Sequence, residues 1–236
     1  MSILSAILYF LAQHPFWAWP VLIAVGVLLG HAMAKWRGRE IWYLLILPFF
    51  LCGPVNIFTA HISNALFLNA FGVNGTAVIT HSEETSSTLN DQNIWAYDAV
   101  LKTSDGKDVL TQFDSMSASI YPIRNEILIP PDGQPFAVKY IPGFARNFVI
   151  LSDQSPYGKK YLISQDRAPV DKAAAQFAVS PNNKAFIAEY RDALRTFLAN
   201  HSHNADPDLV ADYHAKLAGL PPHNANTQMS VPVMPK

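Results

Sequence analysis

Two long stretches of the chain contain no Asp, Glu, Lys or Arg, and this limits its possible folds more than any other feature. They run from Met1 to Ala34 and from Ile41 to Ser82 in a chain of 236 residues. Each contains an apolar segment, Phe16 to Ala34 in the first and Ile41 to Phe58 in the second. About 20 apolar residues, each rising about 1.5 Å, cross a hydrocarbon core of roughly 30 Å. We therefore expect two transmembrane helices.

Tryptophans flank these segments, as they do in the aromatic belts at membrane surfaces. Trp17 and Trp19 begin the first segment, Trp36 follows it and Trp42 begins the second. The alternative is a pair of helices buried in the core of a globular protein. Such core helices rarely have charge-free flanks of this length, so the pattern favours a membrane.

Two shorter apolar segments border the expected spans. Ser2 to Gln13 is only about three turns long and is followed by His14 and Pro15, which favours an interfacial helix over a third crossing. Thr59 to Phe71 carries polar residues and either extends the second helix beyond the bilayer or lies flat on it. We expect residues 1–71 to form a transmembrane hairpin with an N-terminal interfacial helix.

Cations between the spans predict the orientation of the hairpin. Lys35, Arg37 and Arg39 are the only Lys and Arg residues before Ser82, and short loops rich in Lys and Arg stay in the cytoplasm. The loop is therefore expected on the cytoplasmic side, and everything after about Phe71 on the other side. This pattern predicts a multi-pass protein of a bacterial inner membrane with a periplasmic C-terminal domain.

Short β-like runs occupy residues 72–155. They are rich in branched and aromatic residues and bounded by turn formers, and they predict a small antiparallel β barrel or sandwich. Asp105 and Gly106 are expected to form the clearest hairpin, with a type I′ turn. Asp132–Gly133 and Pro142–Gly143 are expected to form further turns. The expected strands are Thr76–His81, Ile94–Lys102, Val109–Phe113, Glu126–Ile129, Phe136–Ile141 and Asn147–Ser152.

Two connecting stretches of this β domain indicate irregular structure. Gly72 to Gly75 contains two glycines and is expected to form a flexible joint between the anchor and the sheet. Ser82 to Asp91 is rich in Ser and Thr and is expected to be a long hairpin loop.

Helical signals replace the strands over residues 156–222. Val170 to Val179 is rich in alanine, and Pro181 to Asn200 has an apolar face at helical spacing, with Ser180 as the expected N-cap. A last helix is expected from Asp206 or Pro207 to Leu217. The predicted fold class is a membrane-anchored α+β protein with C-terminal helices.

The remaining composition excludes some partners. From Glu83 onward acidic residues outnumber basic ones, which argues against nucleic acid, because binding to phosphates requires clustered cations. The single cysteine, Cys52, excludes an intrachain disulfide. Residues 223–236 are polar and contain prolines, which predicts a disordered tail.

The only cluster of potential metal ligands lies between the last two expected helices. Imidazole and carboxylate groups suit zinc, and His201, His203 and Asp206 are the candidate ligands. The alternative is a solvent-exposed loop in which Asp206 caps the last helix. The spacing matches no closed zinc motif, so no cofactor is expected.

Motifs of enzymes and transporters are sparse. The sequence contains no G-x-S-x-G nucleophile elbow and no glycine-rich phosphate loop followed by Lys. His61 and Asn64 are the candidates for an ion path, because ionisable and polar groups within membrane helices often mark one. Packing between helices, or between copies of the protein, is the alternative role of Asn64.

Aromatic residues of the β region are the candidates for a partner-binding surface, because aromatic side chains anchor protein interfaces. Trp95, Tyr97, Tyr121 and Phe144 are the expected contacts. Alternation places Trp95 and Tyr97 on one face of a strand, so a position in the core is the competing interpretation.

Three segments, Gly75–Val78, Tyr97–Gly106 and Val138–Pro142, resemble a bacterial family of unknown function. Its members pair transmembrane helices with a small β module whose last strands carry a valine, x, tyrosine, x, proline pattern, as in the third segment. The chain departs from the family by placing both helices before the module and by adding C-terminal helices. The resemblance implies a membrane-anchored β domain and supplies no catalytic residues.

These patterns together predict a non-enzymatic inner-membrane protein whose extracytoplasmic domain binds an envelope protein. An immunity protein against a secreted toxin is one specific form of this function. Its expected partners are the lipid bilayer, a protein of the envelope and, as a further option, other copies of the chain. A metal-dependent enzyme or sensor using His201 and His203, and a small transport subunit, are the alternatives.

Overall fold

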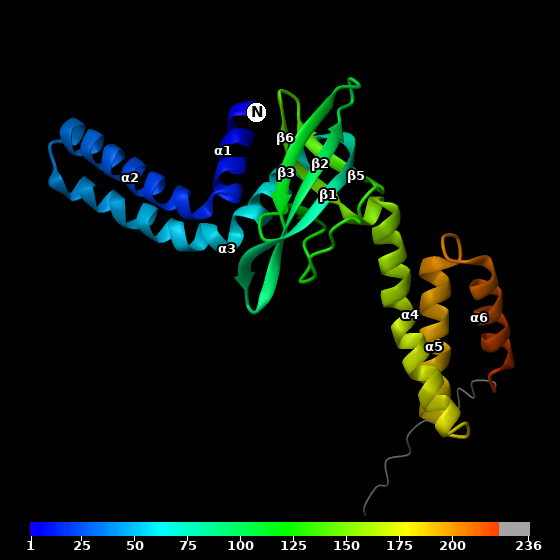
Figure 1. Cartoon of the computed structure of the whole chain (residues 1–236). Helices are drawn as coiled ribbons and strands as arrows, with labels where there is room; N and C mark the ends of the chain where they lie inside the picture. Colours follow the sequence, from blue (N-terminus) through cyan, green and yellow to red (C-terminus); the bar gives the residue numbers. More distant parts are fainter. Residues whose placement is uncertain (222–236) are drawn as a thin grey trace, which may run out of the picture. The chain divides into compact units, whose positions relative to one another are not determined.

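The computed structural model describes residues 1–221, which form an α+β structure with six α-helices and one six-stranded mixed sheet (Figure 1). The expected disordered tail, residues 223–236, lies outside the described residues. The chain divides into two compact units, Met1–Lys159 and Lys160–Lys236. The helices are α1 (Ser2–Gln13), α2 (Pro15–Arg37), α3 (Ile46–Phe71), α4 (Pro156–Val179), α5 (Lys184–His201) and α6 (Pro207–Gly219), and the strands are β1 (Val73–Leu89), β2 (Gln92–Lys102), β3 (Asp108–Asp114), β4 (Ile120–Tyr121), β5 (Pro135–Ile141) and β6 (Phe144–Leu151).

Helices α2 and α3 pack side by side as a hairpin, because small residues on α2 let the two backbones approach closely. Gly26, Gly30 and Ala34 recur at four-residue spacing and are buried. A Cβ atom on Gly26 would lie 2.9 Å from the Cβ of Phe49, and one on Gly30 would lie 3.0 Å from the carbonyl oxygen of Trp42. The interface therefore depends on the absence of side chains at both glycines.

Polar side chains add specific links within this hairpin. The indole Nε1 of Trp19 donates a hydrogen bond to the carbonyl oxygen of Phe50 at 3.0 Å, and the Nδ1 of His31 lies 3.0 Å from the hydroxyl of Tyr43. Trp19 also lies directly against Gly53. These contacts fix how the two helices pair along their length.

Both helices of the hairpin are long and apolar enough to cross a membrane. The second candidate runs from Glu40, where a 3₁₀ turn (Glu40–Leu45) precedes α3, to Phe71. Only 17% and 6% of their most apolar stretches are buried within the protein. A core helix of a globular protein is mostly buried, so the alternative of two core helices does not fit. The two apolar helices are confirmed, whereas their insertion and orientation remain predictions.

The segment Thr59–Phe71 continues α3 as one helix and packs against the sheet. Its buried residues Ala65 and Leu68 form a cluster with Val149 and Leu151 of β6. Helix α1 packs beside it: the amide of Asn56 donates to the carbonyl oxygen of Leu11 in α1 at 3.0 Å. The last turns of α3 thus leave the hairpin and cover one face of the sheet.

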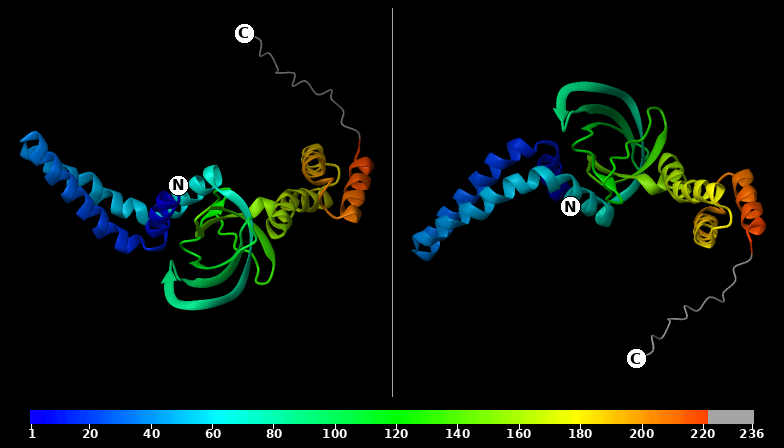
Figure 2. Two further views of the ribbon diagram at one scale, coloured as in Figure 1. Left: turned by 90° about the horizontal axis from the view of Figure 1, so that it is seen from above. Right: turned by 90° about the horizontal axis from the view of Figure 1, so that it is seen from below.

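The sheet is open, with the strand order β3-β2-β1-β5-β6-β4, and its strands curve around the core (Figure 2). The predicted barrel or sandwich is therefore wrong. Strand β4 pairs in parallel with only the last two residues of β6, Ile150 and Leu151. Among the described residues β3 and β6 are not paired as strands, and the hydroxyl of Thr111 instead donates to the backbone carbonyl oxygen of Arg146 at 2.9 Å.

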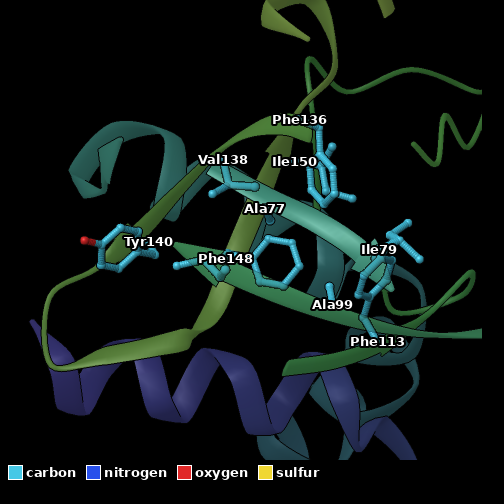
Figure 3. Packing of buried hydrophobic residues seen from close by; sticks show 11 residues of the cluster. Ala77, Ile79, Ala99, Phe113, Phe136, Val138, Tyr140, Phe148 and Ile150 are labelled. Atoms are coloured by element: carbon cyan, nitrogen blue, oxygen red, sulfur yellow. The ribbon is translucent and has the colours of Figure 1, made fainter. Parts of the chain in front are cut away.

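The curved sheet encloses the main hydrophobic core of the first unit. Its side chains converge from β1, β2, β3, β5 and β6 (Figure 3). Phe113 of β3 and Phe148 of β6 meet edge to face at 5.6 Å between ring centroids. The residues buried in this core include Ala77, Ile79, Ala99, Leu101, Phe113, Phe136, Val138, Tyr140, Phe148 and Ile150.

The connection between α3 and the sheet is strand rather than a flexible joint. Strand β1 begins at Val73, one residue after the helix, and Val73 pairs with Tyr140. A Cβ atom on Gly75 would lie 3.0 Å from the ring of Tyr140, so this glycine serves close packing. The sequence prediction for Gly72–Gly75 is therefore wrong.

The hairpin turns differ in part from the predictions. Strand β1 extends through the expected loop to Leu89, and Asn90 and Asp91 form the turn with φ values of 51° and 61°. The hairpin at Asp105–Gly106 is confirmed, but only Gly106 has a positive φ, so the turn is not type I′. Glu126–Ile129 is irregular rather than a strand.

The second unit is helical, as the sequence predicts, but two of its helices start at unexpected places. Helix α4 begins at Pro156 and continues through Pro169. Helix α5 begins after Asn183, whose side chain accepts a hydrogen bond from the N–H of Ala185 at 3.0 Å, so Ser180 is not its N-cap. The predicted cap of α6 is confirmed, since Asp206 accepts from the N–H of Asp208.

Candidate functional site

A buried amide pair holds α1, α3 and β6 together and so positions the candidate site. Asn64 of α3 donates to the Oδ1 of Asn147 of β6 at 2.7 Å, and Asn147 donates back to the Oδ1 of Asn64 at 2.8 Å. Asn147 also donates to the carbonyl and hydroxyl oxygens of Ser5 in α1, both at 3.0 Å. Asn64 donates to the hydroxyl of Ser119 at 2.9 Å. All four side chains are buried.

Beside this joint, the end of α1 and strands β1 to β3 line a cleft of about 400 Å³. Tyr9 and Gln13 of α1, and His14 directly after it, form one side of the cleft. Gln13 is fixed there because its Oε1 accepts a hydrogen bond from the hydroxyl of Ser117 at 3.0 Å. We call this site the acidic cleft, because the strands contribute three carboxylates to its lining.

The register of the strands brings polar residues of the cleft into two neighbouring rows. A β-bulge after Ile79 places His81 opposite Asp98, which in turn pairs with Gln112. The second row contains Glu83, Ala96 and Asp114. Cross-strand partners share a face of a sheet, so the small side chain of Ala96 leaves space between the carboxylates of Glu83 and Asp114. This space is the physical origin of the hollow.

Three carboxylates dominate the electrostatics of the acidic cleft, which has no Lys or Arg among its lining residues. One oxygen of Asp114 accepts from the backbone N–H groups of Met116 and Ser117, at 2.9 and 2.6 Å. Asp98 accepts from the amide of Gln112 at 2.7 Å. Glu83 is exposed and lies 3.8 Å from the Nε2 of His81. The arrangement suits a positively charged ligand group.

Tyr97 of β2 also borders the cleft, but its ring packs against the core, on the opposite face of the strand from Asp98. Tyr97 is half-buried and stacks on Phe113 with ring centroids 5.1 Å apart. Burial and the negative charge of Asp132 raise the pKa of the Tyr97 hydroxyl, so Tyr97 is neutral at physiological pH.

A second hollow of about 400 Å³ continues from the acidic cleft and shares Tyr9, Asp98 and Gln112 with it. Arg146 and the exposed Leu110 line this part. The surface therefore changes from acidic to mixed along the sheet.

The four aromatic residues proposed from the sequence do not form one surface. Tyr97 lines the acidic cleft, and Trp95, two residues away, is 40% exposed. Tyr121 packs instead against the cluster between α3 and β6. Phe144 meets the ring of Tyr9 edge to face at 5.6 Å, so it helps to hold α1.

The proposed metal ligands are not gathered into a metal-binding group. Among the described residues, no group of three or more His, Cys, Asp or Glu residues could hold a metal ion. Both ring nitrogens of the buried His201 already have partners: Nε2 lies 2.9 Å from Asp166 and Nδ1 lies 3.0 Å from Asn204. His203 and Asp206 are exposed. His201 is therefore a core residue of the helical unit.

The cations used to predict orientation lie together in the connection between α2 and α3. Lys35 and Arg37 are in the last turn of α2, and Arg39 precedes the 3₁₀ turn. The guanidinium of Arg37 lies 4.5 Å from the ring centroid of Trp36. The proposed ion-path residue Asn64, in contrast, is buried in the amide pair at the sheet.

The residues of the acidic cleft other than Tyr97 do not stand out in the sequence. They come from three strands, His81 and Glu83 from β1, Asp98 from β2 and Asp114 from β3, and the bulge and the strand register bring them together. The alternating pattern of β2 indicates that Asp98 is on the opposite face from Tyr97. It does not indicate which strands flank it.

A scan against models of protein families and searches of curated proteins and of solved structures found no match. The resemblance to a family of membrane-anchored β modules thus gains no support from these comparisons. The function of the chain has to be argued from the geometry of its own residues.

Proposed function

We propose that this chain is a membrane-anchored, non-enzymatic binding protein that holds a basic segment of an envelope protein in its acidic cleft. The observation that carries the proposal is the convergence of three carboxylates, from Glu83, Asp98 and Asp114, on one cleft that has no Lys or Arg among its lining residues. An immunity protein would be one such binder.

Exposed apolar side chains along the hairpin support anchoring in a bilayer. Leu28 is 68% exposed, Leu44 is 65% exposed and Phe58 is 72% exposed, and contiguous apolar surface of this extent is unfavourable in water. A lipid bilayer would cover it. By the positive-inside rule, the cations between the two helices favour a cytoplasmic loop and a sheet on the opposite side of the membrane.

The single cysteine allows a direct test of this orientation. In a Cys52→Ser background, Glu40→Cys places a thiol in the loop and Asn125→Cys places one on the sheet side, at exposed positions. A thiol reagent that passes the outer but not the inner membrane should label Cys at 125 in intact cells and Cys at 40 only after lysis. The reverse pattern would show that the sheet faces the cytoplasm.

Charge and shape of the acidic cleft support a basic polypeptide segment as its ligand. A Lys or Arg side chain could place its charge between the carboxylates of Glu83 and Asp98 and its stem against Tyr9 of α1, which lines the same cleft. Complementary charge of this kind mainly raises the association rate and fixes the partner. The adjoining hollow around Arg146 could accept an acidic neighbour in the same segment.

Photo-crosslinking in the native membrane tests the binding site. A photoreactive residue at Gln112, in the cleft, should crosslink a specific partner protein, and the same residue at Gln92, exposed at the start of β2, should not. Asp98→Asn should reduce the crosslink several-fold, whereas the exposed control Asp108→Asn should leave it unchanged. Equal crosslinking from both glutamine positions, or no effect of Asp98→Asn, would contradict the proposed site.

A further inference from the structure

A second concave surface lies where α3 leaves the hairpin and meets the sheet. It has a volume of about 460 Å³ and lies between α3 residues 57–62 and the irregular segment 115–127. Its lining is mainly apolar, and its few polar residues include His61, Ser115 and Glu126. We call it the apolar groove. It uses none of the residues of the acidic cleft.

Several apolar side chains of the groove are exposed, although they lie outside the α2–α3 contact. Ile123 is 42% exposed and Ile127 is 61% exposed, both in the irregular segment. Leu89, at the end of β1, is 49% exposed. Exposed apolar side chains from separate parts of the chain that meet at one hollow indicate a surface that is covered in use.

The groove is continuous with the surface that would face lipid. Phe58 of α3 and Phe16 of α2 belong to the apolar hairpin and also line the groove. They are 72% and 67% exposed. A hydrocarbon chain could therefore pass from the bilayer into the groove along Phe58 and Ile62 without crossing water.

We infer that the apolar groove binds an acyl chain of a phospholipid from the surrounding bilayer. The inference rests on the proposed anchoring in a membrane, because only that places the groove at the bilayer surface. A groove of this volume is in the range of small-molecule sites. The polar residues among its lining, such as His61 and Glu126, suit a chain whose headgroup stays in the interfacial region.

The geometry also gives a role to the irregular segment 115–127. Both ends of the segment are fixed, since the N–H of Ser115 donates to the carbonyl oxygen of Trp95 at 2.9 Å and the carbonyl oxygen of Leu128, one residue beyond the segment, accepts from the hydroxyl of Tyr157 at 3.1 Å. The segment therefore holds Ile123 and Ile127 beside α3 instead of folding them into the core. An acyl chain in the groove would cover them.

Photoreactive phospholipids test the inference on the full chain in vesicles of phosphatidylethanolamine and phosphatidylglycerol. A probe with a diazirine near the end of one acyl chain should modify residues 115–127 as well as the hairpin, residues 16–58. Combining Ile123→Glu with Ile127→Glu should lower modification of residues 115–127 at least fivefold. The matched control is Leu110→Glu, which adds a charge at another exposed apolar position and should leave the modification unchanged.

A second variant and the hairpin itself separate the possible failures. Ile62→Trp fills the groove without adding charge and should give the same loss as the two Glu substitutions. If the hairpin is modified and residues 115–127 are not, the groove does not bind an acyl chain and the anchoring stands. If neither is modified, the anchoring fails as well. Modification by a headgroup probe alone would show surface contact only and would overturn the inference.

Discussion

Replacing Asn147 with alanine tests whether the buried amide pair holds α1 and α3 on the sheet. The substitution removes the two bonds exchanged with Asn64 and the donation to Ser5. Each hydrogen bond contributes about 1 kcal/mol net, and a buried group left without its partner costs about 1–3 kcal/mol. Because Asn64 keeps its bond to Ser119, we expect a loss of about 2–4 kcal/mol.

Thermal unfolding in detergent measures this loss of stability. The readout at each temperature is the amount of full-length protein that survives a protease pulse. For a chain of this size 1 kcal/mol corresponds to about 2–4 °C in Tm, so the Tm of Asn147→Ala should fall by roughly 5–15 °C. Asn125→Ala, at an exposed position, is the control and should change stability by less than about 0.5 kcal/mol.

The position of the defect is as informative as its size. Hydrogen exchange of the α1 amides should become faster in Asn147→Ala, because Ser5 loses its link to β6. In a double-mutant cycle with Asn64→Ala, the double substitution should destabilise the protein by about 1–2 kcal/mol less than the sum of the two single substitutions, since the two side chains bond each other. Additive costs, or unchanged exchange in α1, would refute the argument that the amide pair is the joint.

Three further substitutions test other parts of the fold. Gly26→Leu should destabilise the hairpin by about 1–3 kcal/mol through overpacking, measured as a lower Tm in detergent, whereas Val27→Leu at a 43% exposed position should not. Hydrogen bonding from Arg124 lowers the pKa of Asp153 below its usual 3.8, so the pair stabilises the fold above about pH 4 and this contribution is lost as the pH falls through the lowered pKa. Asp153→Asn should therefore cost about 1–2 kcal/mol at pH 7, and its difference from wild type in urea unfolding should disappear in acid; a pH-independent difference would contradict the assignment. Asn183→Ala removes the N-cap of α5 and should cost about 1 kcal/mol, measured by loss of helical circular dichroism in urea, and no loss would show that the cap is not needed.

Local patterns in the sequence predicted the parts of the fold that local patterns determine. Charge-free apolar runs gave the two long helices, and alternation with turn residues gave four of the strands at close to their observed positions. The failures have non-local causes. Ser82–Leu89 lacks an apolar face because this end of β1 is largely exposed, so its sequence resembles that of a loop although it pairs with β2.

Strand β4 shows why the sheet topology could not be predicted from the sequence. Ile120 and Tyr121 form only a two-residue strand, too short for any periodicity, yet they add a sixth, parallel strand to the sheet beside Ile150 and Leu151 of β6. The candidate site could not be predicted either, because it also depends on non-local strand pairing. His81 and Asp98 face each other because of a bulge after Ile79, and the sequence around Ile79 carries no glycine or proline to mark it.

The absence of a flexible joint changes what the proposed anchor can do. Helix α3 runs without interruption from the apolar hairpin to the face of β6, and Val73 enters the sheet one residue after it ends. The amide pair adds α1 as a second rigid contact at the same place. A sheet held in this way cannot turn freely above a bilayer, so the heights of the acidic cleft and the apolar groove are both set by the depth of α3. A partner that binds the cleft would therefore do so at a fixed distance from the lipid surface, and this restriction favours membrane-bound partners over free ones.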